Sequence, residues 1–242
     1  MSKSIIFIYG ILAYTVALLA QVWFILYIGE WEFMETSVNT QYPVPFISAF
    51  SINLILVSIF ALQHSVMARS FFKHYLTKII PQAAERSTYV LFSGLALGLI
   101  CLYWQPLEGF LWQVDNEIGK ALLTAGYLFG WAFSLFSTFI INHFELFGLQ
   151  QIYRNLLNKP EPSVAFKERL FYKWVRHPIQ LGILIGVWLT PTMSYSHLML
   201  SVTLSIYIFI GLKYEERDLI YTLGNTYKEY QKRVRMMLPF PK

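Results

Sequence analysis

The amino-acid sequence predicts an all-α, polytopic transmembrane helical bundle with a cytosolic C-terminal helical cap. Three observations predict this fold class. Of the 242 residues, 56% are hydrophobic and only 14% are charged, whereas an ordinary soluble domain carries about 25% charged residues. The mean hydropathy is +0.47, and the apolar residues are grouped into long runs along nearly the whole chain. One soluble core cannot hide so much apolar surface, so we expect the lipid bilayer to be the main partner.

The apolar runs predict five or six membrane helices. About 20 helical residues cross a hydrocarbon core of ~30 Å, and the first four runs approach that length. The last two are shorter and form a hairpin around Pro191, because a 12-residue helix over 179–190 reaches only ~18 Å. That helix is either shallow or completes its crossing through part of the turn. The runs cover residues 5–28, 46–67, 88–104, 120–141, 179–190 and 197–212.

The distribution of basic residues predicts the orientation of the chain. Segments 29–45 and 105–118 contain acidic residues and no Lys or Arg, and 18 of the 19 basic residues fall on the other side of the bilayer. The positive-inside rule then places both termini in the cytosol. The same rule explains the net charge of +5 without a nucleic-acid partner. We expect one membrane domain over 1–242, with four helices in 1–141 and a functional half in 142–242.

The most informative motif begins the fifth apolar run. Pro178 favours the first helical position and biases His177 away from helix, so a helix is expected to start here. Its free N–H groups would suit an anionic group beside Arg176, and Gly182 would let another group approach closely. The spacing alone equally fits a positive-inside arginine followed by a helix-starting proline. The motif reads Arg176-His177-Pro178-Ile179-Gln180-Leu181-Gly182.

A second motif follows the last apolar run. Glu215 and Glu216 come directly after membrane residues, where an uncompensated carboxylate is costly, so we expect them to pair with a cation such as Arg176 or to hold a ligand cation. Apolar and aromatic residues then recur at helical spacing through Tyr227, which predicts an amphipathic helix pair broken at Gly224. A solvated interfacial helix with acidic residues in its first turn is the alternative.

Together the two motifs resemble the isoprenylcysteine carboxyl methyltransferases and their relatives. The resemblance implies an S-adenosylmethionine pocket on the cytosolic side. It departs at Gln180, where those relatives usually have Tyr, which leaves the contacts there and a lipidated substrate in doubt. The residues that the resemblance assigns to the cofactor are Arg176, His177, Pro178, Gln180, Leu181, Gly182, Glu215, Glu216 and Tyr227.

Three upstream stretches, Gln63–Arg69, Glu85–Leu91 and Asn142–Gln150, are similar to the bacterial NnrU-like branch of these proteins. With the two motifs, the combination most resembles the methanethiol S-methyltransferases, over about 60–240. The resemblance implies S-methylation of a small thiol, from methanethiol to dimethyl sulfide, with release of S-adenosylhomocysteine.

Two histidines are candidates for the chemistry of such a reaction. A thiol is largely protonated at neutral pH, since even the cysteine side chain has a pKa of ~8.5, so the site needs a base or a cationic environment. His64 and His143 end the second and fourth spans on the cytosolic side, and either is a candidate base. Arg69, Arg86 or Arg176 would stabilise the thiolate. An ordinary interfacial role fits a lone histidine equally well, and the spacings favour no metal site.

Two alternatives stay open. One is another enzyme on this scaffold, either a methyltransferase for a larger thiol, an isoprenoid or a carboxylate, or a reductase, because membrane sterol reductases share a related Arg-His-Pro pocket. The other is a non-catalytic NnrU-like membrane factor. The spans contain few charged residues, which argues against a transport path.

Overall fold

The computed structural model describes residues 2–160, 166 and 168–238. Within these residues, five helices are long and apolar enough to cross a bilayer, and one further apolar helix, α8 (Pro178–Trp188), is shorter. The chain is therefore an integral membrane protein with an all-α fold, as the sequence predicts. The five long helices are α1 (Lys3–Gly29), α2 (Phe46–Met67), α4 (Gln82–Tyr103), α5 (Glu117–Ile141) and α9 (Tyr195–Leu223).

Short elements connect the long helices. Two of them, β1 (Phe110–Gln113) and β2 (Thr192–Ser194), pair as a two-stranded sheet. The others are the helices α3 (Ser70–Leu76), α6 (His143–Leu146), α7 (Leu149–Leu156) and α10 (Asn225–Arg233), and the 3-10 turn η1 (Leu170–Lys173).

The chain divides into two compact units. Unit 1 comprises residues 1–111, 143–162 and 193–200, and unit 2 comprises residues 112–142, 163–192 and 201–242. Unit 1 therefore holds α1 to α4, α6 and α7, whereas unit 2 holds α5, α8, α10 and most of α9.

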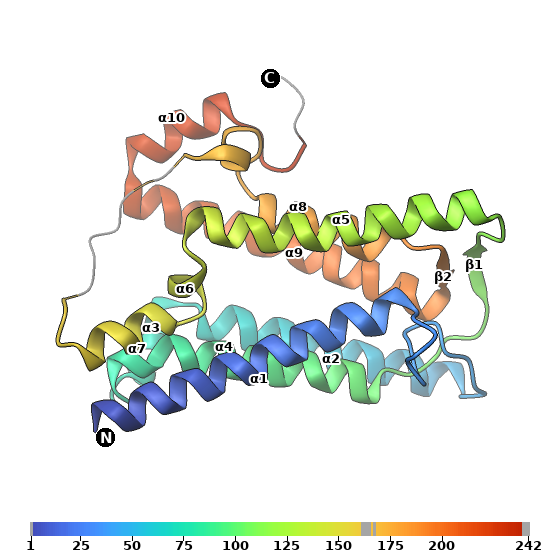
Figure 1. Cartoon of the computed structure of the whole chain (residues 1–242), viewed down its shortest axis with the longest axis horizontal. Helices are drawn as coiled ribbons and strands as arrows, with labels where there is room; N and C mark the ends of the chain where they lie inside the picture. Colours follow the sequence, from blue (N-terminus) through green and yellow to red (C-terminus); the bar gives the residue numbers. More distant parts are fainter. Residues whose placement is uncertain (1, 161–165, 167, 239–242) are drawn as a thin grey trace. The chain divides into compact units, whose positions relative to one another are not determined.

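In unit 1, small residues let α1 lie directly against its neighbours (Figure 1). A Cβ atom added at Gly94 of α4 would lie 2.6 Å from the Cα atom of Ala17 in α1. A Cβ atom added at Gly10 would lie 2.4 Å from Cδ1 of Ile152 in α7. Membrane helices associate through this kind of close packing, because lipid offers no hydrophobic drive between them.

The buried polar side chain of Asn53 joins α2 to the segment that follows α4 in unit 1. Asn53 is fully buried. Its amide donates to the carbonyl oxygen of Gln105 at 2.8 Å and accepts the backbone N–H of Gln105 at 2.7 Å. An unpaired polar group buried away from water is costly, and the reciprocal pair removes that cost.

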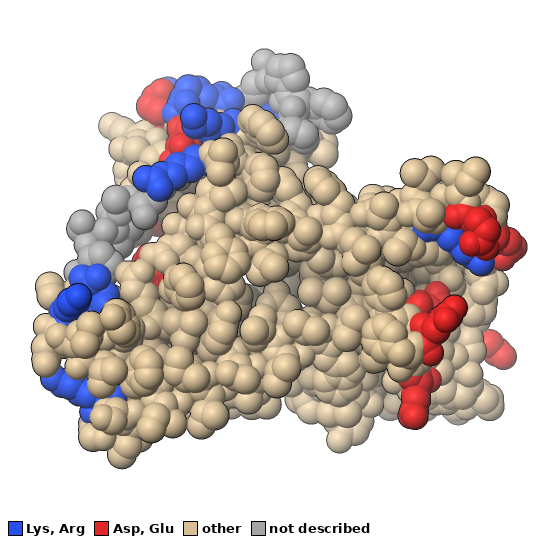
Figure 2. Space-filling view, viewed as in Figure 1, with Lys and Arg blue, Asp and Glu red and all other residues tan. Residues whose placement is uncertain are grey.

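The two ends of unit 1 carry opposite charge (Figure 2). Lys and Arg side chains gather at the end where the chain begins, and Asp and Glu side chains gather at the other end, over the loops that follow α1 and α4. Between these ends the surface in view is almost free of charged side chains. This is the pattern expected of a unit that crosses a membrane.

In unit 2, glycine residues bring α5 and α8 into backbone contact. A Cβ atom added at Gly182 would lie 2.5 Å from the carbonyl oxygen of Gly130, and one added at Gly130 would lie 2.5 Å from the backbone nitrogen of Gly186. The sequence predicts a close approach at Gly182, and the structure identifies the approaching group as the backbone of α5.

The last two helices of the chain differ in length. With 11 residues, α8 extends only roughly 17 Å, as its short apolar run predicts. With 29 residues, α9 extends about 44 Å, so it continues well beyond the apolar run 197–212. It ends one residue before Gly224, whose φ of +58° suits a glycine and separates α9 from α10. The predicted helix break at Gly224 is confirmed.

Candidate functional site

The start of α8 is fixed by the C-terminal segment of unit 2. Pro178 occupies the first helical turn, as the sequence predicts. The backbone N–H of Arg176 donates to the carbonyl oxygen of Arg235 at 2.9 Å, and that of His177 donates to Met236 at 3.2 Å. The chain is thereby held in place immediately before the helix begins, which positions the side chains of Arg176 and His177.

A buried ion pair joins this segment to α9. Nε of Arg176 lies 2.6 Å from Oε1 of Glu216, and the two residues are only 9% and 8% exposed. The predicted pairing of these two residues is confirmed. Glu216 also accepts from the Tyr227 hydroxyl at 3.4 Å and from Nε2 of Gln231 at 2.9 Å. Nη1 of Arg176 donates to the carbonyl oxygen of Val234, so the pair connects three segments of unit 2.

His177 lies between the two glutamates of α9. Its Nε2 atom is 3.1 Å from Oε1 of Glu216, and a carboxylate paired with arginine can only accept, so Nε2 carries a hydrogen. Its Nδ1 atom is 3.8 Å from Oε2 of Glu215, whose side chain is 48% exposed. Glu216 therefore belongs to the buried framework, whereas Glu215 presents a carboxylate that a ligand can reach.

Tyr227 supports this framework from α10. Burial, and then the negative charge of Glu216, raises the pKa of the Tyr227 phenol. The group therefore stays protonated and donates to Glu216 at neutral pH. Tyr227 packs with Tyr230 and Val234 in one buried cluster, and the Tyr230 hydroxyl donates to the carbonyl oxygen of Tyr172.

The first turn of α8 keeps polar groups available for a ligand. Among the described residues, neither the half-buried side chain of Gln180 nor the backbone N–H groups of Ile179 and Gln180 have a hydrogen-bond partner. Leu181, in contrast, packs into the apolar cluster around Ile208 and Leu212. Free N–H groups at a helix N-terminus favour an anionic group.

In unit 1, His143 is buried at the start of α6. Only 3% of the residue is exposed, and its Nε2 atom is hydrogen bonded to the Tyr14 hydroxyl at 3.0 Å. The ring of Phe147 lies 4.6 Å away, measured between ring centres. Burial lowers the pKa of His143 below its ordinary value of 6.5, so the imidazole is neutral at pH 7 and can accept a proton.

His64 has a comparable tyrosine partner, and its tautomer follows from the surrounding bonds. The Ser93 hydroxyl donates to the carbonyl oxygen of Tyr89 at 2.9 Å. It must therefore accept from Nδ1 of His64, which lies 3.0 Å away. Nε2 of His64 is then an acceptor for the Tyr89 hydroxyl at 2.7 Å. Both ring nitrogens of His64 are therefore engaged in hydrogen bonds.

The two candidate arginines of unit 1 have different surroundings. Nε of Arg86 donates to the carbonyl oxygen of Leu146 at 2.7 Å, and its guanidinium lies over the Tyr89 ring. Arg86 thus links α4 to α6, the helix that carries His143. Nε of Arg69 donates a hydrogen bond to the carbonyl oxygen of Ser65 in α2 at 3.4 Å.

Sequence reasoning missed the tyrosines that partner the histidines. Tyr14 lies 129 positions before His143, and Tyr89 lies 25 positions after His64, so no local spacing signals either pair. Ser93 follows Tyr89 by four residues on the same helix face, a weak signal that becomes useful only once Tyr89 is known to bind His64. The histidine group belongs to unit 1 and the Arg176–Glu216 group to unit 2.

The fold and these side chains define a class of integral membrane protein in which a short apolar helix starts at an Arg-His-Pro segment fastened to a glutamate. Comparison with known proteins identifies the family. The chain is 42% identical to the methanethiol S-methyltransferase of Mycobacterium tuberculosis over 241 residues, which cover 100% of this chain and 98% of that protein. It is 40% identical to that of Crocosphaera subtropica over 240 residues, which cover 99% and 94%. The chain belongs to the methanethiol S-methyltransferase family.

A more distant relative widens the comparison. Nurim from Bos taurus is 28% identical over 177 residues, which cover 70% of this chain and 67% of that protein. No family model matches the chain, and no solved structure matches it.

Proposed function

We propose that this protein transfers a methyl group from S-adenosylmethionine to methanethiol, producing dimethyl sulfide and S-adenosylhomocysteine. The observation that carries the proposal is the identity of 40–42% along nearly the whole chain to proteins named methanethiol S-methyltransferase. The ionic framework around Arg176 and Glu216 supports it, because it positions residues of both motifs on which the resemblance rests.

The residues around the start of α8 suit this cofactor. Its amino-acid portion carries a carboxylate and an ammonium group, and its methyl sulfonium supplies the electrophilic carbon. The free N–H groups of Ile179 and Gln180 are suitable donors for the carboxylate. The half-exposed carboxylate of Glu215 is a suitable partner for the ammonium group.

We assign two roles to the remaining cofactor residues of the motifs. One group of residues holds the site in shape, because their polar groups bond to one another and to the backbone. These residues are Arg176, Glu216 and Tyr227. Pro178 starts α8, and Leu181 and Gly182 anchor it in unit 2. We assign contact with the cofactor to His177, Gln180 and Glu215.

His143 is the proposed base for the thiol. The thiol proton passes to the oxygen of Tyr14 as the hydroxyl proton of Tyr14 passes to Nε2 of the neutral imidazole, and Nε2 then donates to that oxygen. The thiolate sulfur forms a bond to the methyl carbon as the bond from that carbon to the sulfonium sulfur breaks. Arg86 and Arg69 are proposed to stabilise the thiolate, Arg86 also by holding α6 through Leu146.

We further propose that the protein lies in the bacterial inner membrane with both termini and the cofactor site in the cytosol. The separation of charge between the two ends of unit 1 supports this orientation (Figure 2). It also gives the soluble cofactor direct access from the compartment in which it is made.

The function is tested with purified protein, S-adenosylmethionine labelled in its methyl group, and a panel of thiols, with volatile products followed by gas chromatography. Labelled dimethyl sulfide should form with methanethiol and decline with longer alkanethiols. Methylation of a prenylated thiol but not of methanethiol would refute the small-thiol assignment. His143→Ala should abolish turnover but leave S-adenosylhomocysteine binding, measured by calorimetry, unchanged.

A further inference from the structure

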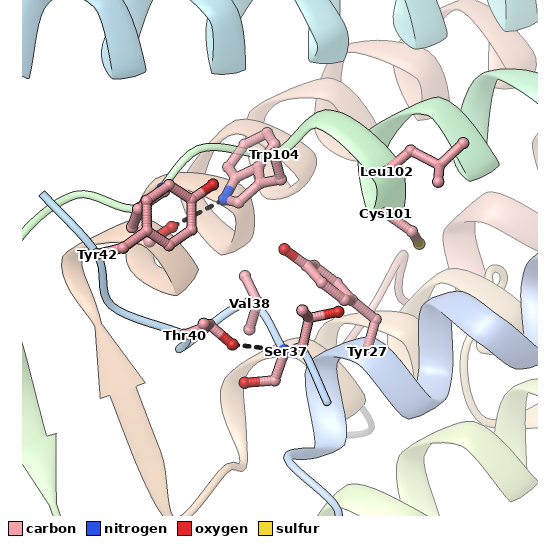
Figure 3. A pocket seen from close by; sticks show the side chains of 11 residues that line it. Tyr27, Ser37, Val38, Thr40, Tyr42, Cys101, Leu102 and Trp104 are labelled. Carbon is pink, nitrogen blue, oxygen red and sulfur yellow. Dashed lines mark hydrogen bonds between the residues drawn. The ribbon is translucent and has the colours of Figure 1, made fainter. Parts of the chain in front are cut away.

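Unit 1 contains a partly open cavity that the proposed reaction does not use. Its volume is about 80 Å³. It lies between the end of α1, the loop that follows it, the end of α4 and the start of α9 (Figure 3). We call it the Tyr27 cavity, after the residue whose phenol faces it, and its walls include Tyr27, Val38, Thr40, Tyr42, Cys101 and Trp104.

Hydrogen bonds hold the walls of the Tyr27 cavity in place. The backbone N–H of Val38 donates to the carbonyl oxygen of Tyr27 at 3.0 Å. The indole N–H of Trp104 donates to the Ser196 hydroxyl at 2.9 Å, and the Thr40 hydroxyl accepts the backbone N–H of Ser37 at 2.7 Å. The cavity is thus preformed, and Trp104 offers its ring, not its N–H, to an occupant.

The buried phenol of Tyr27 differs from the bonded side chains of Trp104 and Thr40. Tyr27 is only 4% exposed, and its hydroxyl points into the space beside Trp104 (Figure 3). Within the described part of the chain, this hydroxyl has no hydrogen-bond partner. The hydroxyl borders the space of the partly open cavity, so its donor is available to whatever occupies that space. A small molecule that accepts a hydrogen bond would satisfy it.

The walls also restrict the charge and size of an occupant. Of the described residues that line the cavity, none carries a charged side chain, so the charged cofactor and its product are excluded on electrostatic grounds. The volume corresponds to about two to three water molecules, which suits a molecule of very few non-hydrogen atoms. Three aromatic rings line the cavity, from Tyr27, Tyr42 and Trp104, and divalent sulfur packs favourably against aromatic rings.

We propose that the Tyr27 cavity binds dimethyl sulfide. This inference rests on the proposed function, which supplies the molecule as its product. Dimethyl sulfide is neutral, has three non-hydrogen atoms, and carries a sulfur that accepts a weak hydrogen bond, as the methionine thioether does. The Tyr27 hydroxyl donates to that sulfur, and its two methyl groups contact the aromatic walls. Because the cavity lies at the acidic end of unit 1, the site serves release of the product away from the cytosol.

Binding is measured directly, without turnover, by saturation-transfer NMR of dimethyl sulfide with the purified full-length protein in detergent. Tyr27→Phe removes only the donor, and because a thioether is a weak acceptor we expect a loss of affinity of about two- to fivefold. Cys101→Leu fills the cavity and should abolish saturable binding. The matched control is Tyr9→Phe, which removes a phenol from the same helix outside the cavity and should bind as the wild type does.

The outcomes separate this inference from the proposed function. Absence of saturable binding by the wild-type protein overturns the inference, because the cavity then holds only water. Equal binding by the wild type, Tyr27→Phe and Cys101→Leu overturns it as well, since dimethyl sulfide then binds elsewhere. If Cys101→Leu does not fold, the comparison of Tyr27→Phe with Tyr9→Phe still decides. Binding without methyl transfer would refute the proposed function and leave the site in place.

Discussion

The ion pair between Arg176 and Glu216 allows a quantitative prediction. Glu216→Gln keeps the size of the side chain but removes its charge, and so leaves the Arg176 guanidinium buried without a counter-ion. Both residues are less than a tenth exposed, so solvent screens the loss little. Breaking a buried pair by removing one partner costs about 3–5 kcal/mol. For a chain of this size the midpoint of thermal unfolding should fall by roughly 6–20 °C.

The assay is thermal unfolding of the purified protein in detergent, with two matched variants. Glu215→Gln changes the neighbouring carboxylate, which is half exposed, and should leave the midpoint unchanged while weakening cofactor binding. The double variant Arg176→Met with Glu216→Gln removes both charges, and it should recover much of the lost stability because an apolar replacement often equals a buried pair. A Glu216→Gln midpoint within measurement error of the wild type would show that the pair does not hold unit 2 together.

Two further predictions concern helix packing and the proposed base. Gly182→Ala places a Cβ atom 2.5 Å from the carbonyl oxygen of Gly130 and should lower stability in the same assay by about 1–3 kcal/mol. Gly98→Ala, whose Cβ atom meets nothing within 4 Å, should be neutral or stabilising; equal losses would refute the contact. Because burial lowers the pKa of His143, kcat/KM should rise with pH through an acid limb below 6.5 and then level off. A limb above pH 7 would argue against His143 as the base, and Tyr14→Phe should shift the limb.

The sequence predicts much of this architecture because membrane solvation leaves strong signals. Apolar composition locates the spans, and Pro178 marks the start of α8. Because a carboxylate next to the bilayer is costly, the sequence also predicts that Glu216 pairs with a cation such as Arg176. Composition does not locate the end of α9, however. Charged residues after position 212 mark where the bilayer ends, whereas the backbone hydrogen bonds continue to Leu223.

Side-chain partners from distant helices are harder to predict. Gln231 and Tyr227 reach Glu216 only because α10 folds back after Gly224, and nothing in their spacing indicates that contact. Likewise, Gly182 predicts that another group approaches closely, but nothing near it in the sequence indicates that this group is the backbone of α5. Such contacts depend on the packing angle and register of helices, which one sequence does not encode locally.

The shortness of α8 has a consequence for the biogenesis of the protein. A helix of 11 residues is too short for stable insertion on its own, since about 20 residues are needed. In addition, the charge of Arg176, which precedes α8, has no counter-ion until Glu216 is synthesised 40 residues later. We therefore expect α8 to enter the membrane together with α9 as one helical hairpin. A ribosome stalled at the point where α8 has left the exit tunnel and α9 is still inside it should leave α8 accessible to protease, and release of the stall should protect it.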